Sequence, residues 1–517
     1  MSQPVRFKIK GTSVYVDAVP PGIRAQASSD QSAYTTVGSG SRSRNWRAPG
    51  LGPNAALDYS ADGLRNQSRD QVRKNTLAAA AVERIVSNVV GTGIKPTFPN
   101  PDHQKLWNTW TDESAADGVL DFYGQQGLGM SGIVTAGEVF ARLRTRLPQD
   151  GLSVPLQIEL LESEFCPVDK NEAPQVNDQG VVIRGEIRQG IEFHPTVRSR
   201  RVAYWLYPRH PHDRGAFIGT NEPVRVPASE VLHLYLPTRP GQLRGEPWMA
   251  RTLARLKDLE AYDSAELVRK KIAAMFAGFI RRPIPEGAGL DLEELAEIWG
   301  DGAEIDGGIG LAGLEPGSMQ VLKPGEEIEF SDPKDVGGMY EIYMRHQIRM
   351  IAASLGLLYE QLSGDFSQVN DRTWRAAVSE FRRRCETWQH HLMVFQFCRP
   401  VARRWAELAV LSGAARELDP AAQIAWTPQR WPYINPLQDV QTLEKEIQAG
   451  LNSRKRVVSE RGDDVEQIDA EQQADAERAD GKGLKYTSDG RSVVSGNIPG
   501  SAFEDDDPPS RSRKKQE

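Results

Sequence analysis

The stretch from Tyr340 to Arg384 constrains the fold of this chain more than any other. It opens with apolar residues at helical spacing and ends that pattern on IAASLGL. It then passes through the polar run YEQLSGDFSQVN and resumes a long helical pattern with basic residues along one face. Helical periodicity on both sides of a short polar run predicts two helices joined by a loop. We therefore expect a helix at Tyr340–Leu355, a loop within Leu358–Asn370 and a long helix after it.

Length and charge limit the classes of protein to consider. The chain has 517 residues, enough for about two to four domains with a buried core. Its net charge is -7, whereas a protein that grips DNA by counterion release normally carries a basic surface. Either DNA is not a ligand, or it must slide past this protein without sticking.

Cysteine usage and apolar runs bear on the compartment. The three cysteines form no CxxC pair, and their odd number argues against a disulfide framework, which fits a reducing cytoplasm. The first residues contain no long apolar run of the signal-peptide type. Because no stretch of about 18 apolar residues occurs, we expect no membrane span.

Before the opening stretch, the patterns change several times. Residues 1–75 are rich in Ser, Gly and Arg and predict a flexible arm. A helix is expected from Thr76, with Gly91 just past its end. Short alternating runs between Gly132 and Tyr235 predict strands, so this part has an α+β pattern. A helix of about thirty residues is expected from Pro247, a residue suited to a first turn.

The segment Arg281–Asp332 is a compositional outlier. It holds thirteen acidic and three basic residues, a net charge of -10, and is rich in Gly and Pro. It predicts an exposed acidic module between two long helices. Farther on, Pro400 predicts a kink near residues 396–400 of a helix that continues to about Ser412. The tail from about Ala470 has the composition of a disordered segment.

Several blocks, in a fixed order, carry a resemblance to a known family. They are IVSNVVGTGIKP, GEVFARLR with LQIELLESEFC, GIEFHPTVRSRRVAYWLYPRHPHD, VPASEVLHLYLPTRPGQLRGEPWMARTL, DLEAYDSAELVRKKIAAMFAGFI, LEPGSMQVLKPGEEIEFSDP, the opening stretch, WTPQRWPYINPLQDV and GLNSRKRVVSERGDD. No single block is diagnostic, but the ordered set is specific. Over residues 76–470 the chain resembles the portal proteins of tailed bacteriophages, lambda family.

The resemblance implies an α+β portal fold and a ring oligomer, typically of twelve subunits. The implied segments are a flexible arm (1–75), an α+β wing (76–246), stem helix 1 (247–280), an acidic clip (281–332), stem helix 2 (333–357), a tunnel loop (358–371), a long kinked helix with the wing return (372–437), a helical crown (438–470) and a disordered tail (471–517). One departure stands out: where family members tend to carry Tyr-Ser-Ser-like residues, this chain has Asp371-Arg372-Thr373. The shape and charge of the loop therefore do not transfer from the family.

The implied function is that of a channel at one capsid vertex. Double-stranded DNA would be packaged through it by terminase and later ejected, with weak and non-specific DNA contact. The implied partners are further copies of the chain, the terminase large subunit, capsid or scaffold, head–tail adaptor (neck) proteins and DNA in transit, with no cofactor and no membrane. The expected location is the portal vertex of the virion, assembled in the cytoplasm of the bacterial host.

Candidate site residues follow from this mapping. The DNA-channel candidates on the loop are Ser363, Asp365, Phe366, Ser367, Gln368 and Asn370, and those on the stem are Lys270, Lys271, Arg345 and Arg349. The candidates for partner docking on the clip are Glu293, Glu294, Glu326 and Glu327. Short polar loop side chains suit a non-adhesive lining. The stem cations would form weak rings that damp sliding, or else ion pairs and solvated faces.

Phe366 is the aromatic residue among the candidates on the loop. Intact duplex exposes no free base faces, so a role in packing is favoured over base stacking.

The sequence gives little support to an enzymatic function. The chain contains no GxxxxGK[ST], GxSxG or HExxH motif. His210, His212 and His233 give only a weak metal signal, and no catalytic or metal-binding residue is predicted. Two alternatives remain at this stage. One is a metal-dependent nuclease or maturation protease of phage assembly that uses the acidic segment, and the other is a soluble adaptor without a channel.

Overall fold

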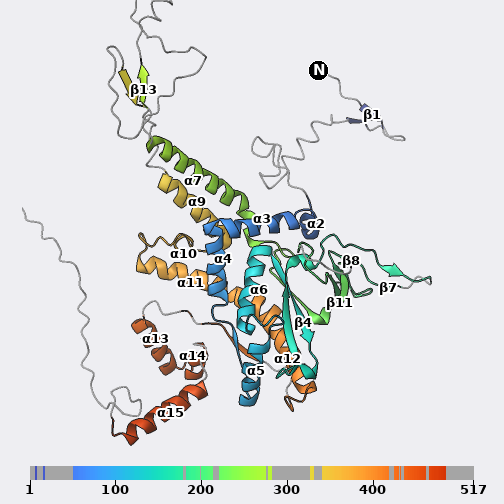
Figure 1. Ribbon diagram of the computed structural model, residues 1–517, viewed down its shortest axis with the longest axis vertical. Coiled ribbons are helices and arrows are strands. Elements are labelled where there is room, and N and C mark those ends of the chain that lie inside the picture. The colour runs from blue at the N-terminus through green and yellow to red at the C-terminus, as the bar shows by residue number, and fades with distance from the viewer. Residues whose placement is uncertain are drawn as a thin grey trace, which may run out of the picture.

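The computed structural model describes residues 6–8, 15–17, 50–178, 182–197, 199–213, 220–274, 278–281, 327–330, 340–417, 424–429, 431, 436–460 and 465–484. Helices and strands both contribute to its folded body, as the α+β pattern predicts (Figure 1). Among the described helices, none combines the length and the apolar character needed to cross a lipid bilayer.

A large core joins helices from distant parts of the chain. It gathers α4 (Thr76–Val89), α5 (Pro101–Glu113), α6 (Phe122–Ala136) and the long helix near the C-terminal end of the body. Trp107 and Trp110 are fully buried beside Trp405, with 5.0 Å between the ring centroids of Trp107 and Trp405. The prediction that Gly91 follows the end of α4 is confirmed, because Gly91 has a left-handed φ of 57°.

Two antiparallel sheets make up most of the strand region. The first has the order β12-β4-β5, from Val231–Tyr235, Glu138–Thr145 and Leu156–Leu161. The second has the order β11-β10-β9-β8, from Val224–Pro227, Arg201–Leu206, Ile191–Phe193 and Ile187–Arg188. Strand β4 alternates between two cores, because Val139, Ala141 and Leu143 face the large core whereas Phe140 belongs to the second one.

Short strands complete this part of the chain. β6 (Gln175–Val176) pairs with β7 (Val182–Arg184), and β3 (Lys95–Thr97) pairs with β15 (Ala425–Thr427). The second pair brings a segment far along the chain back to the end of α4. Two strands near the N-terminus, β1 (Arg6–Lys8) and β2 (Tyr15–Asp17), also pair antiparallel.

Helices α7 (Leu253–Ala274) and α9 (Tyr340–Leu355) lie side by side and project from the body (Figure 1). The bounds predicted for α9 are confirmed. The helix expected from Pro247 to Ile280 is shorter than predicted, since it begins with a 3-10 turn at Trp248–Arg251 and ends at Ala274. Strand β13 (Gly278–Arg281) takes up its last residues, because Phe279 and Ile280 favour a strand that pairs with β14 (Glu327–Phe330).

The long helix after the loop is continuous but not uniform. It consists of α11 (Asp371–Trp388), the π-helical segment η6 (Gln389–Cys398) and α12 (Arg399–Leu411). The kink predicted near residues 396–400 stays a prediction; what the structure shows there is the end of this π-helical segment, two residues before Pro400. Pro400 lacks an N–H and its ring crowds the carbonyl of Gln396, so a widened turn before it accommodates both effects.

The two ends of the body differ from the sequence expectation. Within the predicted flexible arm, α2 (Pro53–Asp58) and α3 (Ala61–Lys74) are ordered helices, and Arg65 and Ser68 of α3 are buried. Because these buried residues are polar, the hydropathy pattern did not reveal the helix that carries them. Helices α13 (Pro436–Gln448) and α14 (Arg454–Glu460) occupy the predicted crown. α15 (Val465–Gly481) extends into the predicted disordered tail, so its residues 471–481 are helical.

Candidate functional site

The segment between α9 and α11 forms an ordered loop around a short helix, α10 (Tyr359–Ser363). Gly364 follows in a left-handed conformation with φ 71°, which turns the chain away from α10. The Ser363 hydroxyl donates to the carbonyl of Tyr359 at 2.8 Å and accepts from the amide of Asp365 at 3.1 Å. Local hydrogen bonds thus define the path of the loop.

Asp365 is the centre of the loop's own polar contacts. Its carboxylate accepts hydrogen bonds from the Ser367 hydroxyl at 2.6 Å, the Ser367 amide at 3.1 Å and the Tyr359 hydroxyl at 3.2 Å. These bonds, those of Ser367 first, lower the pKa of Asp365. The carboxylate is therefore ionised at neutral pH and already engaged.

Arg345 of α9 ties the helix to the loop. Its guanidinium donates to Gln368 Oε1 at 2.9 Å and to Glu341 at 2.7 Å, and lies 3.8 Å from the Asp365 carboxylate. One turn farther along α9, the guanidinium of Arg349 lies 5.2 Å from the ring centroid of Tyr359. With Ser363 and Ser367, which are hydrogen-bonded to Asp365, the structure thus brings together six of the predicted site residues: Arg345, Arg349, Ser363, Asp365, Ser367 and Gln368.

The remaining loop residues have structural contacts. Phe366 is 53% exposed and packs edge-on against Trp374, with 5.3 Å between ring centroids. Asn370 caps α11, because its side-chain oxygen accepts from the amides of Arg372 and Thr373 at 2.9 and 3.3 Å. The divergent Asp371-Arg372-Thr373 run forms the first turn of α11.

One of the two stem candidates on α7 contacts the other end of α9. Lys270 lies over the ring of Tyr340, 5.2 Å from its centroid. The Tyr340 hydroxyl donates to Asp263, and this bond raises the pKa of Tyr340 to about 12. Lys271 is exposed on the same helix. Lys270 and Lys271 are therefore separate from the cluster around Arg345 and Asp365.

The acidic clip is mostly outside the described residues. Glu293, Glu294 and Glu326 belong to that part, and Glu327 is described only as the first residue of β14, paired in register with Arg281. Their role in docking stays a prediction.

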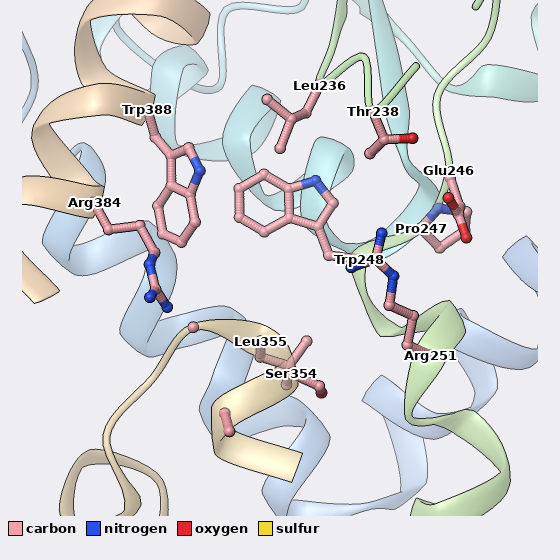
Figure 2. Close-up of a pocket in the computed structure, with 12 residues that line it drawn as sticks. Leu236, Thr238, Glu246, Pro247, Trp248, Arg251, Ser354, Leu355, Arg384 and Trp388 are labelled. Atoms are coloured by element: carbon pink, nitrogen blue, oxygen red, sulfur yellow. The ribbon is translucent and has the colours of Figure 1, made fainter. Parts of the chain in front are cut away.

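A cavity of about 300 Å³ lies where the bases of the two projecting helices meet α11 (Figure 2). The indole rings of Trp248 and Trp388 line it side by side and are in contact, with 4.7 Å between centroids and planes tilted by 47°. Arg384 lies close to Gly356, where a Cβ would come within 2.2 Å of the guanidinium. Sequence reasoning missed this junction because its two tryptophans belong to segments far apart in the chain.

A buried ion network supports the sheet region. Arg244 donates to Glu138 at 2.6 Å, and both side chains are almost fully inaccessible. His233 Nε2 donates to Glu138 at 2.9 Å, and its Nδ1 accepts from Arg201 at 3.1 Å. Burial alone would raise the pKa of Glu138, but Arg244 and His233 hold it well below its ordinary value. Burial lowers the pKa of His233 to about 4.

Glu162, Glu164 and His210 are close enough together to be considered as metal ligands. However, the guanidinium of Arg69 lies 3.3 Å from Glu162 and donates to Glu164 at 3.0 Å. An arginine already neutralises these carboxylates, so the group is better described as an ion network. His233 belongs to the buried network around Glu138, so the three histidines do not form one site.

The cysteines are also buried. All three are free thiols, and burial raises the pKa of Cys166 to about 11 and that of Cys385 to about 12. A thiol with so high a pKa is protonated at neutral pH and unsuited to nucleophilic chemistry.

Comparison with known proteins gives concordant relatives. The portal protein of Escherichia phage N15 is 24% identical over 485 residues, which cover 84% of this chain and 88% of that protein. Portal protein B of Escherichia phage lambda is 23% identical over 500 residues, covering 87% and 90%. A solved structure titled "Neck of native GTA particle computed with C12 symmetry" matches with 15% identity, a TM-score of 0.43 and coverage of 79% of this chain and 93% of that one.

A family model gives the assignment. The model described as "Phage portal protein, lambda family" matches residues 39–389, more than half of the sequence. This chain therefore belongs to the lambda family of phage portal proteins.

Proposed function

We propose that this phage portal protein assembles as a ring of twelve copies at one vertex of the capsid, and that double-stranded DNA passes through the ring during packaging by terminase and during ejection. The family is structural rather than enzymatic, so the nuclease and protease alternatives are rejected. In this proposal α7 and α9 form the stem, the residues from 281 to 332 the clip, residues 76–246 the wing, and residues 438–470 the crown.

The contact of Arg345 with Gln368 and Asp365 carries the proposal for the loop. It ties the loop to a long helix, so that the loop would hold a defined position at a constriction instead of yielding to a passing duplex. The helix cap at Asn370 defines the other end of the loop in the same way.

The loop's chemistry supports passage of DNA without tight binding. The hydroxyl groups of Ser363 and Ser367 already donate hydrogen bonds within the loop, to the carbonyl of Tyr359 and to the carboxylate of Asp365. The charge of Arg345 is offset by Glu341 and Asp365. Few groups remain free to replace the counterions of a phosphate backbone, and such replacement is what makes DNA binding strong.

The proposed partners follow from position and charge. The acidic residues between 281 and 332 would dock the terminase large subunit and the neck proteins, while the crown would face the capsid interior. Replacement of Glu293 and Glu294 by Lys should weaken this docking in a pull-down assay. Unchanged docking of this variant would mean that the partners bind to another part of the protein.

Assembly and the loop can be tested separately. Mass photometry should detect particles near the mass of twelve 57.4 kDa chains, about 690 kDa. Deletion within Gly364–Asn370 should leave these particles intact but reduce the DNA retained in filled heads. A persistent monomer at all salt concentrations would argue against the ring, and normal DNA retention in the deletion variant would argue against the loop assignment. Negative-stain particles without a central hole would favour the adaptor alternative.

A further inference from the structure

The outer face of the long helix carries an unusually regular exposed stripe. Its members recur at every fourth residue, through α11, η6 and α12, and all are exposed. They are Arg383, Thr387, His391, Phe395, Arg399 and Arg403. We call this set the basic stripe.

The π-helical segment keeps the stripe straight. In an α-helix a residue four positions on is rotated forward by about 40°. In the wider π turn, four residues fall short of a full turn and the drift runs backward. The two drifts offset each other because η6 (Gln389–Cys398) lies between α11 and α12. A uniform α-helix would have wound these side chains around its axis.

The opposite face of the same helix packs against the core. The residue two positions after each member of the stripe is buried, and these residues are Cys385, Gln389, Met393, Phe397, Val401 and Trp405. The ring of Phe397 stacks on that of Phe122 of α6 at 5.5 Å, and Trp405 packs on Trp107 of α5. Helices α5 and α6 therefore cover one side of the long helix, and the stripe is the other side.

The stripe has charges without partners and an apolar centre. Among the residues that the structure describes, no carboxylate lies within ion-pair distance of Arg383, Arg399 or Arg403. Phe395, in the middle, is 62% exposed. A partner must therefore offer both anionic groups and an apolar contact. The phosphate backbone of a duplex offers only the first of these, which favours a protein partner.

The connection between α5 and α6 offers both carboxylates and an apolar side chain. It belongs to the helices that cover the side of the long helix opposite to the stripe. Asp112, in the last turn of α5, and Asp117, after the helix, are exposed, and Val119 between the helices is 75% exposed. The described residues include no cation within ion-pair distance of Asp112 or Asp117. The connection is also well anchored, because the amide of Ala116 donates to the carbonyl of Ile158 at 3.0 Å.

We propose that the basic stripe of one copy docks on the α5–α6 connection of the next copy. The inference rests on the ring proposed above and assigns one of its interfaces. A cyclic ring needs two different surfaces on opposite sides of each subunit, which the stripe and the connection provide. Phe395 then contacts Val119, while Arg399 and Arg403 meet Asp112 and Asp117.

Two charge-reversed proteins test this pairing by complementation. In the first, Arg399→Glu with Arg403→Glu makes the stripe acidic; in the second, Asp112→Arg with Asp117→Arg makes the connection basic. Each alone places like charges together, and the assembled fraction should fall by about tenfold or more. Mixed in equal amounts, the two should form alternating rings of the wild-type size. The matched control is Arg73→Glu with Arg84→Glu, two exposed arginines on α3 and α4, and it should assemble normally.

The outcomes separate this inference from the ring itself. A wild-type protein that never assembles overturns both. Wild-type assembly by the acidic-stripe variant overturns the interface and leaves the ring. Loss of DNA retention without loss of assembly in that variant would assign the stripe to DNA and also overturn the interface.

A cross-linking experiment guards against misfolding of the reversed variants. Val119→Cys combined with Phe395→Cys in one chain should give, on mild oxidation, a disulfide-linked ladder beyond the dimer. The ladder indicates head-to-tail pairing when neither Val119→Cys alone nor Phe395→Cys alone forms a dimer, because 395–395 bonds alternating with 119–119 bonds would also extend it. Rings without any ladder would overturn the proposed contact, and so would a ladder accompanied by dimers of the single-cysteine variants.

Discussion

Arginine–carboxylate contacts occur in two contrasting regions of this portal protein. Around Arg345, the guanidinium is 21% exposed and its partner Glu341 is 79% exposed. Around Arg244, the corresponding values are 1% for the arginine and 2% for Glu138. Exposed pairs are screened by solvent and stabilise little, whereas a buried pair cannot lose one member without leaving an unpaired charge in the interior. The same chemistry therefore positions a loop in one region and holds the fold together in the other.

The strongest test of this contrast is the same substitution in both regions. Arg244→Met leaves the Glu138 carboxylate buried without its main counter-charge, so the free energy of unfolding should fall by about 3–5 kcal/mol. Arg345→Met should change it by less than about 1 kcal/mol. Unfolding of both variants in guanidinium chloride measures the two losses of free energy. Each variant is compared with wild-type protein in the same assembly state. Equal losses would show that burial does not distinguish the two regions.

The buried network should also respond to acid. The folded-state pKa of His233 is lowered to about 4 from an ordinary 6.5, so the unfolded chain binds this proton more readily. Stability should therefore decline as the pH falls from about 6.5 to 4, by roughly 3 kcal/mol for this group. The depressed pKa of Glu138 adds a further loss at still lower pH.

Unfolding midpoints in urea measured across this pH range test the assignment. His233→Gln should flatten the profile between pH 4 and 6.5, whereas replacement of the exposed His212 by Gln should leave it unchanged. An unaltered profile in the His233 variant would assign the pH dependence to other groups.

Local patterns predicted much of the fold in both regions. The bounds of α9 and the positions of β4, β5 and β12 follow from periodicity and turn residues, because each residue's environment is set by near neighbours in sequence. The helix predicted from Pro247 to Ile280 was too long, because Phe279 and Ile280 pair with β14 in spite of the helical pattern. Tertiary contact decided that boundary.

The contacts that define the site were harder to predict. Glu138 and Arg244 lie 106 residues apart, and no local signal pairs them. Arg345 and Gln368 were each predicted, but their hydrogen bond depends on how the loop folds back along α9. The π-helical segment was not predicted, because Pro400 indicated a kink and sequence does not distinguish a kink from a widened turn.

A smaller effect is expected at the end of the loop. Asn370→Ala removes the acceptor for two amides at the start of α11, which should cost about 1 kcal/mol of helix stability. Hydrogen exchange should increase at Arg372 and Thr373 and little elsewhere. Asn370→Ser is the matched control, since a serine can still cap the helix. Equal exchange in both variants would mean that packing, not the cap, holds this turn.

The smallest global effect and the most specific local one should come from Arg345→Gln. Because the pair with Glu341 is solvent-screened, unfolding free energy should change by less than about 1 kcal/mol. The loop, however, loses its contact with α9 through Gln368, so amides held within it, such as those of Ser367 and Val369, should exchange faster. Arg372→Gln, at an exposed arginine in the first turn of α11, is the control and should leave these amides unchanged. If the Arg345 variant exchanged like wild type, the loop's internal bonds to Asp365 would suffice to order it. The difference between the two regions would then lie in the loop itself and not in its link to the helix.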